Sequence, residues 1–223
     1  PESLQDDLDD VDLNFVKEDI TKILQSMKVG SNRIQDIVVS LRNFSRLDQA
    51  EVKPVDLHQG IDNTLMILQH RLKARAERPA IEIVREYGDL PLVECYAGQL
   101  NQVFMNLLSN AIDALEESNA GRSFRDIVDK PNRISIKTTK TEQDCVQITI
   151  ADNGAGIPEK LRSRIFDPFF TTKPVGKGTG LGLSISYQVV TEKHGGKLWC
   201  DSTQGEGTQF AFEIPIHRTD VDG

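Results

Sequence analysis

The strongest constraint on the fold of this chain is a series of apolar residues in its first quarter, which step alternately by three and four positions. Gly30 stands in one of the apolar positions of this heptad seam. The seam predicts a long helix in a bundle or coiled coil, because a helix of about 35 residues exceeds what an ordinary domain covers. We expect a homodimer through this helix; the alternative is a helix lying on its own domain's core. The apolar positions are Leu13, Val16, Ile20, Ile23, Met27, Ile34, Ile37, Leu41 and Phe44.

The residues on either side of this helix indicate the domain boundaries. Half of residues 1–12 are acidic and the segment has little to bury, which favours a mobile, solvated segment. Pro54 ends the long helix, which we therefore place at residues 13–53. A second domain is expected from residue 54 to 217, followed by a short tail at 218–223.

The second domain combines helical and extended patterns. Asp56 with Gln59 resembles a capping box that begins a helix with Ile61, Leu65 and Leu68 on one face. A short Gly-rich segment separates the last two expected strands, which is typical of a hairpin. These features predict an α+β fold with a mixed or antiparallel sheet. Strands are expected at 81–84, 92–95, 134–138, 146–150, 197–203 and 208–214, and helices at 97–117 and 181–193.

Composition excludes several classes of protein. Lys and Arg total 26 against 34 Asp and Glu, a net charge of −8, which disfavours a nucleic-acid partner. Cys95, Cys145 and Cys200 are far apart and odd in number, so we expect reduced thiols. No apolar run approaches the roughly 20 residues that span a bilayer. A cytoplasmic location without membrane contact is therefore expected.

One face of the helix at 97–117 carries a polar stripe. Asn106, Asn110 and Asp113 are spaced so that they line up away from the apolar residues of this helix. A solvated polar face is the ordinary explanation, but asparagine is a mediocre helix former, and two of them in one stripe suggest a binding role.

Two glycine-rich segments follow. Asp152, Gly154 and Gly156 come directly after a strand, where a carboxylate can accept a hydrogen bond from an exocyclic amine and the glycines let the backbone pass close to a flat ring. A plain turn is the alternative. Residues 176–182 hold four glycines ahead of a helix, which is typical of an anion cradle. This segment does not fit a Walker A loop.

The order of these segments is more specific than any one of them. It resembles the ATP-binding domain of histidine kinases, with an N box at 106–114, a G1 box at 152–156, an F box at 166–170 and a G2 box at 178–182. The resemblance covers residues 54–215, and the heptad helix resembles the second helix of the family's dimerisation and phosphoacceptor hairpin.

The resemblance implies a two-layer α/β sandwich, the Bergerat-type ATP-binding fold, with nucleotide between the helices and a lid. Asp152 would accept from the adenine amine, supported by Thr208, and Asn110 would coordinate Mg²⁺. Lys173 or Lys177 would place positive charge on the phosphates. The remaining residues expected to contact the nucleotide are Asn106, Asp113, Gly154, Gly156, Ile157, Phe166, Phe170, Gly178, Thr179, Gly180, Leu181 and Gly182. For the phenylalanines of the F box, ordinary core packing is an equal alternative.

Asn106 bears on the reaction. Gyrase-like and MutL-like relatives carry a glutamate there to activate water, whereas asparagine cannot take a proton, which favours transfer to a histidine over hydrolysis. The implied function is a sensor histidine kinase that relays phosphate to the receiver domain of a response regulator. Alternatives are a nucleotide-binding regulatory module without transfer and a kinase of protein hydroxyls.

The family's phosphoacceptor pattern is absent from this sequence. None of His58, His70, His194 and His217 is followed by the expected acidic residue and Asn-Pro. We therefore expect a truncated piece of a longer protein that binds ATP but cannot autophosphorylate alone.

Overall fold

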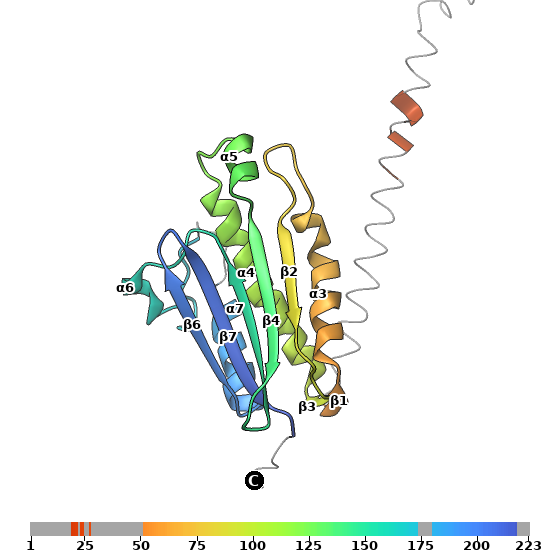
Figure 1. Cartoon of the computed structure of the whole chain (residues 1–223), viewed down its shortest axis with the longest axis vertical. Coiled ribbons are helices and arrows are strands. Elements are labelled where there is room, and N and C mark those ends of the chain that lie inside the picture. Colours follow the sequence, from red (N-terminus) through yellow and green to blue (C-terminus); the bar gives the residue numbers. More distant parts are fainter. Residues whose placement is uncertain (1–18, 22, 25–26, 28–50, 174–179, 218–223) are drawn as a thin grey trace, which may run out of the picture. The chain divides into compact units, whose positions relative to one another are not determined.

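The computed structural model describes residues 19–21, 23–24, 27, 51–173 and 180–217 (Figure 1). The chain divides into two compact units, residues 1–43 and 44–223. In the first unit the described residues are helical, and Ile20, Ile23, Leu24 and Met27 are more than half exposed. The rest of the heptad seam, the acidic segment and the tail after residue 217 lie outside the described residues. The described part contains no helix long and apolar enough to cross a membrane.

The second unit is built on a five-stranded mixed sheet, ordered β2-β4-β5-β7-β6. β2 pairs with β4 in parallel, and the other neighbours are antiparallel. β6 and β7 form the expected hairpin, in which Ser202 lies opposite Thr208. The strands are β2 (Glu82–Tyr87), β4 (Arg133–Lys140), β5 (Cys145–Asp152), β6 (Lys197–Thr203) and β7 (Gly207–Pro215).

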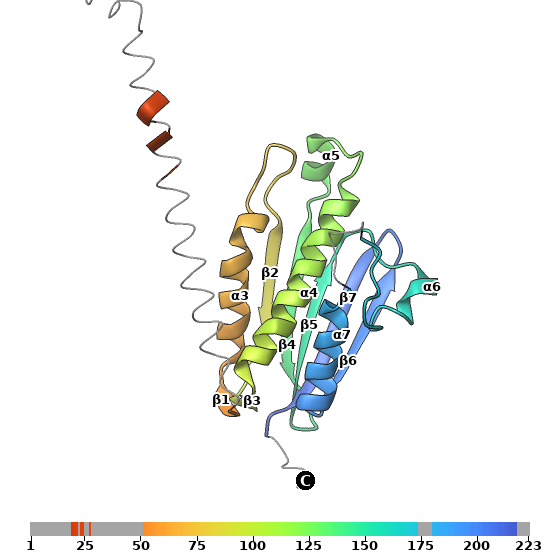
Figure 2. The same cartoon turned by 180° about the vertical axis from the view of Figure 1, so that it is seen from behind.

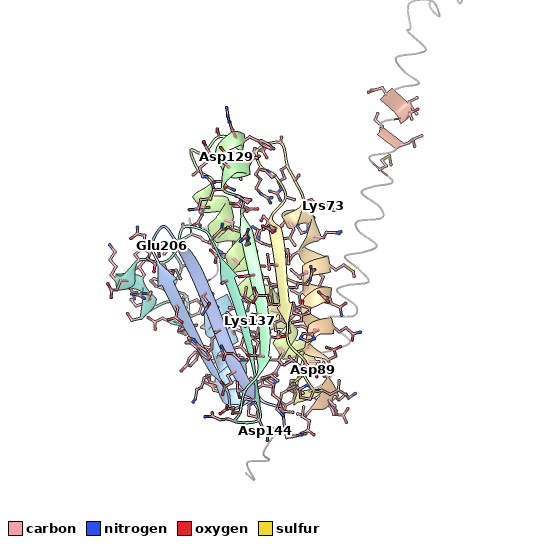
Figure 3. The ribbon with its side chains drawn as sticks, in the orientation of Figure 1. Lys73, Asp89, Asp129, Lys137, Asp144 and Glu206 are labelled. Atoms are coloured by element: carbon pink, nitrogen blue, oxygen red, sulfur yellow. The ribbon has the colours of Figure 1, made fainter. Side chains whose placement is uncertain are left out.

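Helices cover one face of this sheet (Figure 2). They are α3 (Leu57–Leu72), α4 (Ala97–Ser118) and α7 (Gly182–Gln188), which continues into a π-helical turn, η1 (Val189–Lys193). The core lies between the two layers, where the rings of Phe104 on α4 and Phe212 on β7 are 6.0 Å apart. The strands alternate as expected for a half-buried sheet: Ile136 and Thr138 are buried, and Lys137 between them lies on the open face (Figure 3). This two-layer α+β architecture confirms the expected fold class.

The start of the second unit corrects one boundary and adds elements that the sequence pattern did not predict. Lys53 belongs to a strand, β1 (Lys53–Val55), rather than to the long helix, because it pairs with Cys95 of β3 (Val93–Cys95). Asp56 then caps α3, accepting from the backbone N–H of His58 at 2.9 Å. Two short helices, α5 (Phe124–Asp129) and α6 (Glu159–Arg162), were not predicted.

Candidate functional site

A cavity of about 400 Å³ lies where the polar stripe of α4 meets the end of β5 and the beginning of α7. The N-box, G1, F-box and G2 segments all contribute to its wall, so the fold brings together the segments that the sequence separates. The predicted residues that line the cavity are Asn106, Asn110, Asp113, Asp152, Gly156, Ile157, Phe170, Lys173, Gly180, Gly182 and Thr208. Gly154, Phe166 and Leu181 are described but do not line it, and Lys177, Gly178 and Thr179 lie outside the described residues.

Asp152 supplies a mostly buried carboxylate to this cavity at the end of β5. Its Oδ1 accepts from the backbone N–H of Gly154 at 2.8 Å. Burial raises the pKa of this carboxyl to about 6, although hydrogen bonds from the backbone N–H groups of Gly154 and Thr208 oppose the rise. A carboxylate that is costly to desolvate and faces a cavity gains free energy from a ligand that donates a hydrogen bond to it.

The loop after Asp152 is pressed against β6. Gly156 has φ +68°, and a Cβ there would lie 2.0 Å from the carbonyl oxygen of Thr203. The carbonyl of Ala155 accepts from the N–H of Gly205 at 2.7 Å, which ties the loop to the β6–β7 turn. Glycine at 156 is therefore required by both backbone conformation and space.

Ser202 is a site residue that the sequence analysis missed. Its hydroxyl accepts from the N–H of Ile157 at 2.8 Å, donates to the carbonyl of Gly207 at 2.9 Å and lies 3.0 Å from the hydroxyl of Thr208. It thus fixes the G1 loop and the beginning of β7 to one another. The register of the predicted hairpin could have indicated it, because Ser202 lies opposite Thr208.

Asn106 holds α7 in place. Its amide nitrogen donates to the carbonyl of Gly182 at 2.8 Å and to the hydroxyl of Ser186 at 3.1 Å. The side chain also lines the cavity. Its donor is therefore used to position the G2 segment, a role that the predicted contact with the nucleotide did not include.

Asn110 and Asp113 contact Lys173 across the cavity wall. The ammonium of Lys173 bonds the carboxylate of Asp113 and lies 3.4 Å from the amide oxygen of Asn110. Asp113 also accepts from Arg71 of α3 at 2.5 Å. Burial raises the pKa of Asp113, but the hydrogen bonds from Lys173 and Arg71 outweigh it and hold this pKa below its usual value. Arg71 is a second residue that the sequence analysis missed.

The phenylalanines of the F box have different surroundings. Phe166 and Phe170 pack against the core, as the core-packing alternative requires, and Phe170 also lines the cavity. The guanidinium of Arg164 lies 4.7 Å from the centre of the Phe170 ring. Phe169 is 74% exposed and has φ +64°, and a Cβ on Gly180 would lie 2.4 Å from its carbonyl carbon. The F and G2 segments therefore meet at the backbone.

The four histidines, all within the described residues, lie outside the cavity wall. His58 stacks on Tyr87 with ring centres 4.3 Å apart, and its Nε2 lies 2.8 Å from the hydroxyl of Thr138. Nε2 of His194 accepts from the N–H of Tyr96 at 3.1 Å. Both side chains thus make contacts within the fold.

Comparison with known proteins identifies the relatives of this chain. The family profile described as "Histidine kinase-, DNA gyrase B-, and HSP90-like ATPase" matches residues 96–218, more than half of the chain. Sensor kinase CckA of Brucella abortus is 36% identical over 86% of the chain and 20% of its own length. The chain thus spans about a fifth of the length of this curated relative.

Solved structures show the same similarity. The catalytic domain of histidine kinase ThkA is 30% identical, with a TM-score of 0.59, and the match covers 74% of this chain and 96% of that domain. Histidine kinase ThkA in complex with response regulator protein TrrA is 25% identical, with a TM-score of 0.56, over 89% of this chain and 52% of that one.

Proposed function

The chain belongs to the family of histidine kinase-, DNA gyrase B- and HSP90-like ATPases and contains the catalytic ATPase domain of a sensor histidine kinase, and we propose that it binds Mg-ATP in the cavity described above and transfers the γ-phosphoryl group to a histidine. The observation that carries the proposal is that Asp152, a mostly buried carboxylate that can accept from an adenine amine, lines the same cavity as Lys173, a cation that can bind phosphate. The transferred group would pass on to an aspartate of a response regulator.

The cavity residues fit the implied metal. Asn110 lines the cavity, and its amide oxygen already contacts a cation, the ammonium of Lys173. Amide and carboxylate oxygens are hard ligands suited to Mg²⁺, which retains several waters and binds phosphates. Among the described residues no group of three or more His, Cys, Asp or Glu side chains could hold a metal ion, so nucleotide and water would supply most of the ligands. Bound there by Asn110, Mg²⁺ would neutralise charge on the phosphate oxygens.

The residues of the chain would act mainly by positioning. Asp152 would orient the base through its carboxylate, and Ser202 would keep Thr208 and the G1 loop in place around it. Lys173, with Lys177 as a second candidate, would offset the charge of the phosphates. Asn106 cannot take a proton from water, so the site lacks a base at that position, which favours a nucleophile better than water.

The acceptor histidine and the partners belong to the same proposal. None of the four histidines of this chain stands in the family's phosphoacceptor pattern, so we propose that the chain does not phosphorylate itself and that the acceptor lies on a longer form of the protein. The relationship to a kinase whose complex with a response regulator is known supports a receiver-domain partner. We also propose a homodimer through the N-terminal helix and a cytoplasmic location.

The proposal is tested by mixing this chain with γ-labelled Mg-ATP and a longer, histidine-containing form of the protein whose own site is disabled by Asp152→Asn. Acid-labile label on the longer form should depend on this chain and disappear with Asn110→Ala. Arg85→Gln, which removes an exposed ion pair with Asp62, is the matched control and should leave transfer unchanged. ATP binding without any label would favour a regulatory nucleotide module, and no ATP binding would overturn the proposal.

A further inference from the structure

Asp113 bridges two cations that come from different parts of the fold. Its Oδ1 accepts from Arg71 of α3 at 2.5 Å, and its Oδ2 pairs with the ammonium of Lys173, which follows the F box. The side chains of Arg71, Asp113 and Lys173 are between 21% and 26% exposed. Because solvent screens them incompletely, these pairs interact more strongly than pairs on an open surface.

The two cations are held differently. Arg71 also donates to Glu116 at 2.7 Å, so two carboxylates on successive turns of α4 fix its guanidinium. Lys173 reaches across the cavity wall, where it contacts Asp113 and the amide oxygen of Asn110. Arg71 is thus part of the packing of α3 on α4, whereas Lys173 is held by groups that a ligand in the cavity would meet.

We propose that Asp113 is a positioning residue that holds Lys173 against the cavity wall in competition with the phosphates of the nucleotide, and that Arg71 weakens this hold by neutralising Asp113. The inference rests on the proposed function and deepens it, because it concerns how the same cavity admits a phosphorylated ligand. Asp113 then opposes phosphate binding, and Lys173 exchanges one anionic partner for another.

The physical argument compares the partners of one ammonium. A triphosphate carries several negative charges and offers more acceptor oxygens than a carboxylate, so it can displace Asp113 if the carboxylate holds Lys173 weakly. Arg71 keeps that hold weak because its positive charge repels Lys173 and shares the charge of Asp113. Without Arg71, Asp113 would bind Lys173 more tightly and would also repel the phosphates.

The first test uses the protein without nucleotide. Acetic anhydride is added in trace amounts, and acetylation of Lys173 is measured by mass spectrometry relative to Lys140, which pairs with Asp144 on the surface. Asp113→Asn should raise labelling of Lys173 about three- to tenfold, and Arg71→Gln should lower it. Arg85→Gln should change nothing, because it removes an arginine that pairs with Asp62 instead. Unchanged labelling in Asp113→Asn would overturn the inference.

The second test measures affinities for Mg-ATP and for adenosine by calorimetry. Asp113→Asn should tighten Mg-ATP binding about three- to tenfold and leave adenosine binding unchanged, since adenosine has no phosphate to compete for Lys173. In a Lys173→Met background the same substitution should lose most of its effect. Equal tightening in both backgrounds would mean that Asp113 acts by direct repulsion, and weaker Mg-ATP binding would mean that Asp113 delivers the lysine; either result overturns the inference.

Failure of the proposed function gives a different pattern. A wild-type protein that binds neither Mg-ATP nor adenosine would overturn both the proposed function and the competition, whatever the labelling shows. If the wild-type protein binds Mg-ATP but Asp113→Asn changes neither the acetylation of Lys173 nor the affinity for Mg-ATP, the competition alone is overturned.

Discussion

At the scale of single residues, Asp152 shows how burial prepares a group for a ligand. Folding removes its carboxylate from water and raises its pKa to about 6, even though two backbone N–H groups bond it. The protein therefore holds the ionised group at a cost in stability near neutral pH. A ligand amine that donates a hydrogen bond to this carboxylate would recover part of that cost.

This cost predicts a pH dependence of stability. Because the folded-state pKa of Asp152 is above its unfolded value, the group's contribution is fully present below about pH 4 and is lost as pH rises through about 6. Asp152→Asn should remove this loss. The free energy of unfolding of the variant minus that of wild type should therefore increase by about 2–3 kcal/mol from pH 4 to pH 7. Urea denaturation of both proteins across this range measures it, and parallel profiles would contradict the assignment.

A second prediction separates backbone strain from crowding in the G1 loop. Gly156 and Gly195 have φ of +68° and +63°, but a Cβ on Gly195 meets no heavy atom within 4 Å, whereas one on Gly156 collides with Thr203. Gly195→Ala should cost about 1 kcal/mol, and Gly156→Ala about 3 kcal/mol or more with loss of ATP binding. Denaturation and calorimetry provide the measurements. Equal costs would show that the loop moves away from β6 freely.

The predictable site residues are those whose signal is local in the sequence. Asp152 and Gly156 share one short motif, and the stripe of α4 follows from helix periodicity, so the cavity could be predicted in outline. Arg71 could not, because it reaches the site from α3, which is distant along the chain, and Ser202 could be found only from the register of the β6–β7 hairpin. An arginine in an amphipathic helix and a serine in a strand carry no individual signal, and pairing between elements decides their roles.

At the scale of elements, one side chain of α4 is hydrogen-bonded to the beginning of α7. The amide of Asn106 donates to the carbonyl of Gly182, at the first residue of α7, and to Ser186 one turn later. Leu181, the N-cap of α7, makes no side-chain cap bond. The beginning of this helix is therefore fixed by contact with its neighbour more than by local capping.

Removing this contact should loosen α7. Asn106→Ala should lower the free energy of unfolding by about 1–2 kcal/mol and speed hydrogen exchange in residues 182–193, because two hydrogen bonds are lost. Asn106→Asp should cost more, since a carboxylate cannot donate to the Gly182 carbonyl. Gln102→Ala, which removes an exposed amide from the same helix, is the control. Exchange in α7 that is no faster than in this control would show that other contacts hold the helix.

The predictability of elements follows their length and pattern. α4 and the strands β4 and β5 were predicted because each is long enough for its apolar residues to repeat with the period of a helix or of a strand. The short helices α5 and α6 and strand β1 were missed, since four to six residues, or three in β1, do not establish a period. The π-helical end of the helix at 181–193 was predicted as ordinary helix. At this π-helical turn the side chain of His194 is hydrogen-bonded to the carbonyl of Val189, a contact that the periodicity of apolar residues does not encode.

At the scale of the whole molecule, a buried core holds the two layers of the second unit together. Its buried apolar cluster runs from Leu57 to Ile216 among the described residues and joins both layers. The small sheet of β1 and β3 closes one end, where the N–H of Glu94 also donates to the carbonyl of Ile216 near the end of the described chain. The first strand of the described part of this unit and its last residues therefore meet at the same small sheet.

This arrangement predicts where the chain can be shortened. A form beginning at residue 51 keeps β1, the Asp56 cap and the entire described core, so its unfolding should remain cooperative and its ATP affinity should stay within about twofold of the full chain. A form beginning at residue 57 lacks β1 and the cap, and should lose about 1–3 kcal/mol because an N-cap alone contributes about 1 kcal/mol and β3 loses its partner. Urea denaturation at two protein concentrations, with calorimetry of Mg-ATP binding, tests both forms and separates self-association from folding. If the form from residue 51 loses cooperativity or affinity, residues before 51 contribute to the domain itself; if the form from residue 57 is as stable as the longer one, the small sheet does not close the fold.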